Sequence, residues 1–261
     1  MKYYQDSSVT LYHGDCVEVM KKELIPNNIK VDKVITSPPY NIWKTNAEDR
    51  GYDLYKDNIP NEQYIEWTID IFNCYDKLLN PNGCIAYNMS YGTGNPELMS
   101  LTIAEIIKRT NFTLADILIW KKLAAMPNHM SANKMTRICE FVYVFCRRNE
   151  YDTFTSNKQI TSKSDTSNAV FYEVMYNFFV AANNSETQDL NKATFSVEFV
   201  NNIIDRYVLP TDVVLDNFNG TGTTLVACDG RGIKGIGIEL SEAQCEYTVN
   251  RLKRGVQLSL F

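Results

Sequence analysis

Apolar runs alternate with amphipathic segments along most of the chain. Short runs rich in Val, Ile and Phe are typical of buried strands, and they occur near residues 31–36, 84–89, 113–120, 140–146, 212–216 and 233–238. Between them, apolar residues recur at helical spacing, which predicts helices near 62–79, 96–109, 197–208, 222–230 and 241–254. Strands that alternate with helices favour a mostly parallel sheet between two helical layers. We therefore expect an α/β fold, a three-layer α-β-α sandwich.

A pair of prolines follows the first of these strands, in the segment Thr36-Ser37-Pro38-Pro39-Tyr40-Asn41. Proline fixes φ near −65° and supplies no N–H donor, so the carbonyls before and between the two prolines should be free acceptors at the strand end. Together with the Ser37 hydroxyl and the Tyr40 ring, they suit a planar heterocycle that carries an exocyclic amine. A Pro-Pro turn that only closes a loop between a strand and a helix is the alternative.

A glycine turn follows the strand predicted at 212–216, in the segment Asp216-Asn217-Phe218-Asn219-Gly220-Thr221-Gly222-Thr223. Glycine lets a backbone approach a ligand closely, and the helix start that follows offers free N–H groups. The next strand ends at Glu239, whose carboxylate can hold the hydroxyls of a ribose. A Gly-x-Gly pair alone also occurs in ordinary tight turns. The whole succession of strand, acid, turn, helix, strand and acid predicts a nucleoside site.

Together the two segments resemble the motifs of DNA amino-methyltransferases that use S-adenosylmethionine. The catalytic loop precedes the cofactor loop, an order similar to the β subgroup of that family. Tyr12-His13-Gly14-Asp15-Cys16 resembles the segment that closes on the cofactor adenine, and Leu78-Leu79-Asn80-Pro81-Asn82-Gly83-Cys84 resembles the turn after the catalytic loop. Asn191-Lys192-Ala193-Thr194-Phe195-Ser196 stands where the family has His-Pro-Ala-Thr-Phe-Pro, so the His and both prolines are replaced.

This resemblance implies a mostly parallel, seven-stranded methyltransferase sheet in one domain, residues 1–261, with a small inserted target-recognition region at 153–191. It implies S-adenosylmethionine as the cofactor and a base flipped out of double-stranded DNA as the target. The expected catalytic residues are Ser37, Pro38, Pro39 and Tyr40. The expected cofactor-binding residues are Asp15, Ser37, Phe195, Asp216, Phe218, Gly220, Gly222, Thr223 and Glu239. A cognate restriction endonuclease is a further partner that such enzymes can have.

The sequence leaves two possible target amines, cytosine N4 and adenine N6. The Ser-Pro-Pro-Tyr form of the loop resembles that of cytosine-N4 enzymes, because adenine-N6 enzymes more often begin it with Asp or Asn. Some adenine enzymes carry Ser there, so adenine N6 is the alternative. Cytosine C5 methylation needs a Pro-Cys pair, which the sequence lacks. A non-catalytic DNA-binding module on the same fold is the second alternative.

The charge distribution bears on the DNA partner. The 261 residues carry a net charge of −5, with 22% charged and 44% apolar residues, which is ordinary for a globular protein. The window 121–163 nevertheless holds eight basic and three acidic residues, a basic stripe that can contact phosphates. A solvated charged face is the alternative. The expected DNA contacts are Lys121, Lys122, Lys134, Arg137, Arg147, Lys158 and Lys163.

Cysteine usage and hydropathy narrow the class of protein. Seven cysteines without a Cys-x-x-Cys pair, and only two histidines, predict neither a metal site nor a disulfide framework. No apolar run approaches transmembrane length, and the first residues lack an apolar signal segment. We therefore expect a cytoplasmic protein with no membrane partner.

The resemblance also implies a homodimer, for which the predicted helix at 62–79 offers one argument. Trp67 and Ile71 share one of its faces, while Ile65, Ile69 and Phe72 share another. Most such residues should face the sheet. A helix that covers one sheet needs only one apolar face, so the second is a candidate contact with a partner chain.

Overall fold

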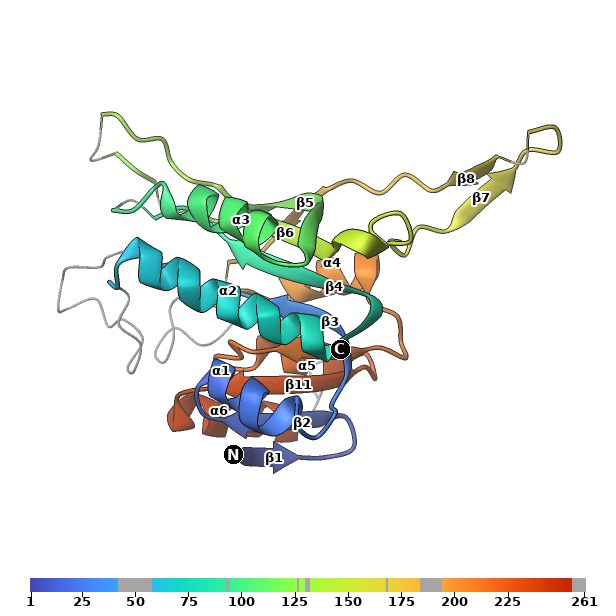
Figure 1. Ribbon diagram of the computed structural model, residues 1–261. Coiled ribbons are helices and arrows are strands. Elements are labelled where there is room, and N and C mark those ends of the chain that lie inside the picture. The colour runs from blue at the N-terminus through green and yellow to red at the C-terminus, as the bar shows by residue number, and fades with distance from the viewer. Residues whose placement is uncertain are drawn as a thin grey trace.

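One mixed sheet forms the centre of the molecule (Figure 1). The computed structural model describes residues 1–41, 58–92, 94–125, 127–129, 132–167, 169–183 and 194–254. In these residues the sheet has nine strands. They are β1 (Lys2–Gln5), β2 (Val9–His13), β3 (Val31–Thr36), β4 (Leu79–Met89), β5 (Phe112–Lys122), β6 (Cys139–Arg147), β9 (Phe178–Ala181), β10 (Val213–Asp216) and β11 (Lys234–Glu239). A separate hairpin pairs β7 (Ile160–Lys163) with β8 (Val170–Tyr172).

Helices cover both faces of the sheet, as expected. On one face lie α1 (Cys16–Val19), the π-helical turn η1 (Met20–Leu24), α2 (Asn61–Leu78) and α3 (Leu98–Arg109). On the other lie α4 (Val197–Tyr207), α5 (Thr223–Asp229) and α6 (Glu242–Lys253), and a short 3-10 turn, η2 (Arg148–Glu150), follows β6. Ser196 caps α4, because its hydroxyl accepts the Phe199 N–H. None of the helices in the described part of the chain combines the length and apolar character needed to cross a bilayer.

The strand order and directions place seven carboxyl ends along one edge of the sheet, those of β2, β11, β10, β3, β4, β5 and β9. The order is β1-β2-β11-β10-β3-β4-β6-β5-β9, and β2, β11, β10, β3 and β4 run parallel to one another. β6 runs antiparallel between β4 and β5, so β6 begins at the same edge. The sheet has two strands more than the expected seven. The additions are the edge strands: β1 pairs antiparallel with β2, and β9 pairs parallel with β5.

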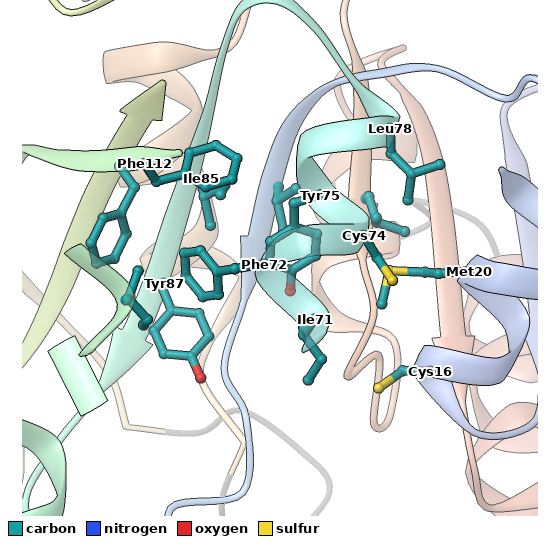
Figure 2. Close-up of a cluster of buried hydrophobic side chains, with 14 of the residues drawn as sticks. Cys16, Met20, Ile71, Phe72, Cys74, Tyr75, Leu78, Ile85, Tyr87 and Phe112 are labelled. Carbon is teal, nitrogen blue, oxygen red and sulfur yellow. The ribbon is translucent and has the colours of Figure 1, made fainter. Parts of the chain in front are cut away.

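The largest core lies between α2 and the sheet (Figure 2). Phe72 is fully buried, and its ring meets the rings of Tyr75, Tyr87, Phe112 and Phe145 at centroid distances of 5.3 to 5.7 Å. All four contacts are edge-to-face, the arrangement that aromatic quadrupoles favour. This packing fixes α2 against β4, β5 and β6.

The structure removes the argument for a partner contact through α2. Ile69, Ile71 and Phe72 are buried within the chain, and Ile65 packs against the same core. Trp67 packs on Phe218, with ring centroids 5.4 Å apart. In the described residues both apolar faces of α2 are therefore covered by the chain itself, because α1 and α3 flank this helix. Packing of α2 within the chain therefore gives no separate support for a partner contact, and the homodimer stays a prediction.

The β7–β8 hairpin projects from the body of the molecule (Figure 1). Asn157 fixes its base, since the side-chain Nδ2 lies 3.0 to 3.3 Å from the carbonyls of Ile204, Asp205 and Val208 at the end of α4. Beyond the hairpin, β9 returns to the main sheet. Only part of the expected insertion at 153–191 therefore stands apart from the sheet, and residues 184–191 lie outside the described residues.

Candidate functional site

A pocket opens at the edge where β2, β10 and β11 end. This edge is where open α/β sheets bind ligands, because loops from neighbouring strands diverge there. The loops after these strands, the loop after β3, and α2 supply the walls. Seven of the nine expected cofactor residues line the pocket: Asp15, Ser37, Phe195, Phe218, Gly220, Thr223 and Glu239.

Asp216 lies behind the pocket wall rather than in it. The residue is only 1% exposed. Its carboxylate accepts hydrogen bonds from the hydroxyls of Thr36 and Thr224, at 2.7 and 2.6 Å, and from the Phe218 N–H at 3.1 Å. Burial raises the pKa of the Asp216 carboxyl to about 6, against those three bonds. Asp216 thus shapes the cofactor loop and ties it to β3.

The two glycines of the turn have different neighbours. Gly220 lines the pocket with φ of 53°, and its carbonyl accepts the Thr248 hydroxyl at 3.3 Å. Gly222 caps α5 with φ of 81°, and a Cβ there would come within 2.5 Å of Thr248 Cγ2. Positive φ favours glycine at both positions. Gly222 therefore allows α5 and α6 to pack closely, which holds Gly220 in place.

Glu239 ends β11 with its carboxylate fixed at the pocket. One oxygen accepts the Gly220 N–H at 2.7 Å and the other accepts the Ser241 N–H at 2.8 Å. Burial raises the pKa of the Glu239 carboxyl to about 7, although both N–H groups favour the charged form. A carboxylate offers about four acceptor positions, so two remain for ligand hydroxyls.

The remaining walls suit the adenosine part of S-adenosylmethionine. Trp67 and Phe218 form an apolar wall, and Phe195 adds a further ring that stacks on Phe199 with centroids 4.7 Å apart. Asn219 Oδ1 and Thr221 Oγ1 are buried and have no hydrogen-bond partner among the described residues. Asn219 Oδ1 lies against Gly237 of β11, so these two atoms belong to the packing behind the wall, and the aromatic rings with Glu239 are what suit adenosine.

Several lining residues were not expected from the sequence. Asn217 and Thr221 lie inside the glycine motif, so the motif itself was their signal. Trp67 comes from the middle of α2 and has no local signal at all. Cys16 also reaches the pocket, but burial raises the pKa of its thiol far above neutral, so it is not a nucleophile at ordinary pH.

The catalytic loop meets the same pocket. Ser37 and Pro39 line it, and the Pro39 carbonyl accepts the Tyr64 hydroxyl of α2 at 2.8 Å. Asn41, fully buried with φ of 51°, closes the loop. Its side chain donates to the Ile59 carbonyl at 2.7 Å and accepts the Ile59 N–H at 2.9 Å. The loop is thus held at both ends before any substrate arrives.

Tyr40 makes polar contacts that the sequence did not predict. Its hydroxyl lies 3.2 Å from Ser37 Oγ, 2.9 Å from Asn88 Oδ1 and 3.0 Å from Glu140 Oε2. Asn88 comes from the end of β4 and Glu140 from the start of β6. The buried Pro38 completes the loop. Two distant strands therefore supply polar partners to the catalytic segment.

Arg147 is not a phosphate contact, contrary to expectation. It holds the end of β6 to α2 and β4. Its Nε bonds to Asp76 Oδ1 at 2.6 Å, and its two terminal nitrogens bond to Glu150 and to the carbonyls of Asp76, Leu79 and Asn80. These acceptors can engage all five guanidinium N–H groups. The pattern of basic residues cannot distinguish such a side chain from an exposed one.

The other basic residues divide into two groups. Lys122 forms an ion pair with Glu140 and lies 5.4 Å from the centre of the Trp120 ring. Arg137 donates to the Tyr91 carbonyl and lies over the Tyr91 ring. These two side chains are therefore engaged within the chain. By accessible surface, Lys121, Lys134, Arg137, Arg148, Lys158 and Lys163 are exposed, whereas Lys122 and Arg147 are half-buried.

Proteins of known family resemble this chain over most of its length. A family model described as DNA methylase, of the N6 and N4 type, matches residues 31–250. The type II methyltransferase M.ScaI of Streptomyces caespitosus is 25% identical over 275 residues, which cover 99% of this chain and 86% of that protein. The type II methyltransferase M.Cfr9I of Citrobacter freundii is 24% identical, over 95% of this chain and 88% of that protein.

Solved structures share the fold. The cytosine-N4-specific PvuII DNA methyltransferase superposes with a TM-score of 0.70 at 20% identity, over 100% of this chain and 90% of that one. M1.HpyAVI, solved as a complex with SAM, superposes with a TM-score of 0.65 at 23% identity, over 94% and 98%. At these identities the likeness shows the α/β fold alone. The match of the family model to residues 31–250 shows more: this chain belongs to the N6/N4 DNA methylase family, whose members are methyl-transferring enzymes.

Proposed function

We propose that the chain transfers a methyl group from S-adenosylmethionine to an exocyclic amine of DNA, and that the methylated base is cytosine, at N4. The observation that carries this proposal is one shared pocket. Ser37 and Pro39 line it together with Gly220 and Glu239, although the two segments are far apart in the sequence. An amine-binding loop and a nucleoside-binding loop thus face the same space.

The cofactor role rests on the chain's own residues. S-adenosylmethionine supplies, when bound, a methyl group already activated for transfer. In this proposal Glu239 accepts the ribose hydroxyls, while Trp67 and Phe218 cover the adenine. Asp15 caps α1 by accepting the Glu18 N–H at 3.0 Å and lines the pocket, and in this proposal its carboxylate meets the adenine edge.

The catalytic role is to prepare a poor nucleophile. The lone pair of an exocyclic amine is delocalised into the base ring. In this proposal Ser37 Oγ and the Pro38 carbonyl accept the two amine hydrogens, which favours a pyramidal nitrogen with an available lone pair. The base must leave the duplex to reach the pocket, and the Tyr40 ring is the surface on which it stacks.

The target base is decided by direct product analysis. Ser37 in the first position of the loop favours cytosine N4, and adenine N6 is the alternative. Unmethylated DNA is incubated with the protein and tritiated S-adenosylmethionine, then digested to nucleosides for mass spectrometry. Detection of N4-methylcytosine supports the proposal. Detection of N6-methyladenine refutes cytosine as the target base. DNA that binds but gains no methyl group favours a non-catalytic module.

We place target recognition in the region 153–191, chiefly on the β7–β8 hairpin. The hairpin and its flanks expose Phe171, Tyr172 and Tyr176, which are 54%, 54% and 74% accessible. Lys158 and Lys163 are exposed in the same region of the chain. Aromatic rings next to cations suit bases and phosphates. Exchange of this region for that of a relative should change the recognised sequence and leave cofactor affinity unaltered.

The assembly is also a proposal. A homodimer, a cognate restriction endonuclease and a cytoplasmic location rest on the likeness to type II methyltransferases alone. The molecular mass measured by light scattering at micromolar protein concentration tests the homodimer. A mass that equals one chain, with and without DNA, contradicts the dimer.

A further inference from the structure

The hydroxyl group of Tyr40 has more acceptors than hydrogens. A tyrosine hydroxyl carries one hydrogen, yet Asn88 Oδ1 and Glu140 Oε2 both lie within 3.0 Å of Tyr40 Oη. The amide of Asn88 cannot turn its nitrogen toward Tyr40 without losing a bond, because Nδ2 donates to the Phe141 carbonyl at 3.0 Å. With Glu140 ionised, one of these two acceptors therefore lacks a hydrogen.

One additional proton completes this network. If Glu140 carries it, Glu140 donates to Tyr40, and Tyr40 donates to Asn88. Ser37, whose Oγ lies 3.2 Å from Tyr40 Oη, is a third oxygen neighbour and reaches the pocket itself. Ser37 Oγ, Tyr40 Oη and Glu140 Oε2 therefore form a chain of neighbouring oxygens from the pocket to a carboxylate. This chain can take up one further proton.

Side chains from two neighbouring strands and from the loop after β3 surround the Glu140 carboxylate. Lys122 of β5 pairs with Oε1, so Oε2 is left for Tyr40. The groups that face this carboxylate are Lys122 from β5, Tyr40 from the loop after β3, and the uncharged Asn88 near it from β4. The Glu140 side chain is 13% exposed, so water can exchange protons with it.

We propose that Glu140 receives the proton that the target amine loses, through the hydroxyls of Ser37 and Tyr40. The inference rests on the proposed methyl transfer and adds a destination for its proton. Glu140 does not touch the substrate and acts through the two hydroxyl groups.

The transfer balances at each atom. When the amine nitrogen has gained a methyl group, one of its N–H bonds breaks, and that electron pair stays on nitrogen. The proton binds Ser37 Oγ while the Ser37 hydrogen moves to Tyr40 and the Tyr40 hydrogen moves to Glu140. Both hydroxyl groups end as they began, and one O–H bond has formed on Glu140. Water then takes the proton away.

The test is the pH profile of single-turnover methyl transfer to DNA. In the wild type, the rate should fall at acid pH, because a protonated Glu140 accepts nothing. Glu140→Gln should be about 10²-fold slower near pH 8, the lower end of what a positioned proton acceptor contributes, and should lose the acid limb. Its affinities for S-adenosylmethionine and DNA should stay within about threefold of the wild type, since neither ligand touches Glu140.

Three further variants separate proton transfer from a structural role. Glu140→Asp should recover part of the rate and the acid limb. Lys122→Met should move the acid limb to higher pH, because the carboxylate then binds protons more readily. Glu105→Gln is the matched control: Glu105 is an ion-paired glutamate on α3, bonded to Lys108 and Arg109, and its loss should leave the profile unchanged.

The outcomes are distinguishable. A wild-type chain that methylates no DNA refutes the proposed function itself. If the wild type is active and Glu140→Gln has the same rate and the same pH profile, the role of Glu140 as proton acceptor is refuted, and the proposed methyl transfer stands. A variant that loses DNA or cofactor affinity in proportion to its rate also overturns it. If Glu140→Gln does not fold, the Lys122→Met profile decides: an unmoved acid limb refutes the proposal.

Discussion

We predict that Glu239 makes cofactor binding dependent on pH. Burial raises the pKa of its carboxyl from 4.5 to about 7, even though Gly220 and Ser241 each donate an N–H to it. The ionised carboxylate has acceptor positions left for two ribose hydroxyls. A protonated carboxyl loses one of those positions to its own hydrogen. The cofactor should therefore bind the ionised form more tightly.

The size of the effect follows from the pKa. With a value of about 7, about 9% of the Glu239 carboxyls are ionised at pH 6 and about 91% at pH 8. A ligand that requires the ionised form thus binds about tenfold more weakly at pH 6 than at pH 8, or about 1.4 kcal/mol.

The same pKa affects the stability of the free chain. The folded state keeps the Glu239 proton up to about pH 7, whereas the unfolded state loses it near pH 4.5. The folded state therefore binds more protons in this window, and the free energy of unfolding falls as pH rises through it. The difference corresponds to about 3 kcal/mol by pH 8. Asp216, whose carboxyl pKa burial raises to about 6, acts in the same direction.

The assay is calorimetric titration with 5′-methylthioadenosine, which has the ribose and adenine but no group that ionises near neutral pH. Wild-type affinity should rise about tenfold from pH 6 to pH 8. Glu239→Gln should bind more weakly and with the same affinity at both values. Urea denaturation of both chains measures the stability effect. A flat wild-type affinity, or an equal pH dependence in the variant, refutes the role of Glu239.

Substitutions at four other positions test the pocket, the Ser37 loop, the end of β6 and the exposed basic residues. Gly220→Val should abolish cofactor binding, because a β-branched residue is strained at φ of 53°; Gly220→Asn, which tolerates this backbone, should fold normally by circular dichroism. Ser37→Ala should lower the single-turnover methylation rate far more than cofactor affinity, and equal losses in both would contradict its role toward the amine. Arg147→Met should lower the free energy of unfolding by about 3 kcal/mol in urea, since it removes the cation from the partly buried Asp76 and Glu150 and leaves Asp76 with the neutral Asn111 amide as a donor. Lys163→Met should leave stability unchanged but weaken DNA binding and flatten its salt dependence, because Lys163 is exposed.

The sequence determined the regular elements with long apolar patterns. The helix expected at 62–79 is α2, Asn61–Leu78, and the strand expected at 31–36 is β3, Val31–Thr36. The sequence did not predict the edge strands β1 and β9, because a strand of four residues is too short for a period of two to be visible. Their pairing depends on neighbours that are distant in the sequence.

The same division holds within the site. Ser37, Gly220 and Glu239 were predictable because each belongs to a contiguous segment whose local chemistry is distinctive. Trp67 and Glu140 were not, because neither has a motif around it. Trp67 reaches the pocket only through the packing of α2.

Topology alone decided the place of Glu140. β6 runs antiparallel to β4, so the start of β6 meets the carboxyl end of β4 and the loop that follows β3. That arrangement brings Glu140 to Tyr40, a hundred positions earlier in the chain. Likewise, only the packed structure shows that Arg147 holds the end of β6 to α2 and β4, whereas Lys163 is exposed to solvent. Sequence records which functional groups are present, whereas strand order and direction determine which of them meet.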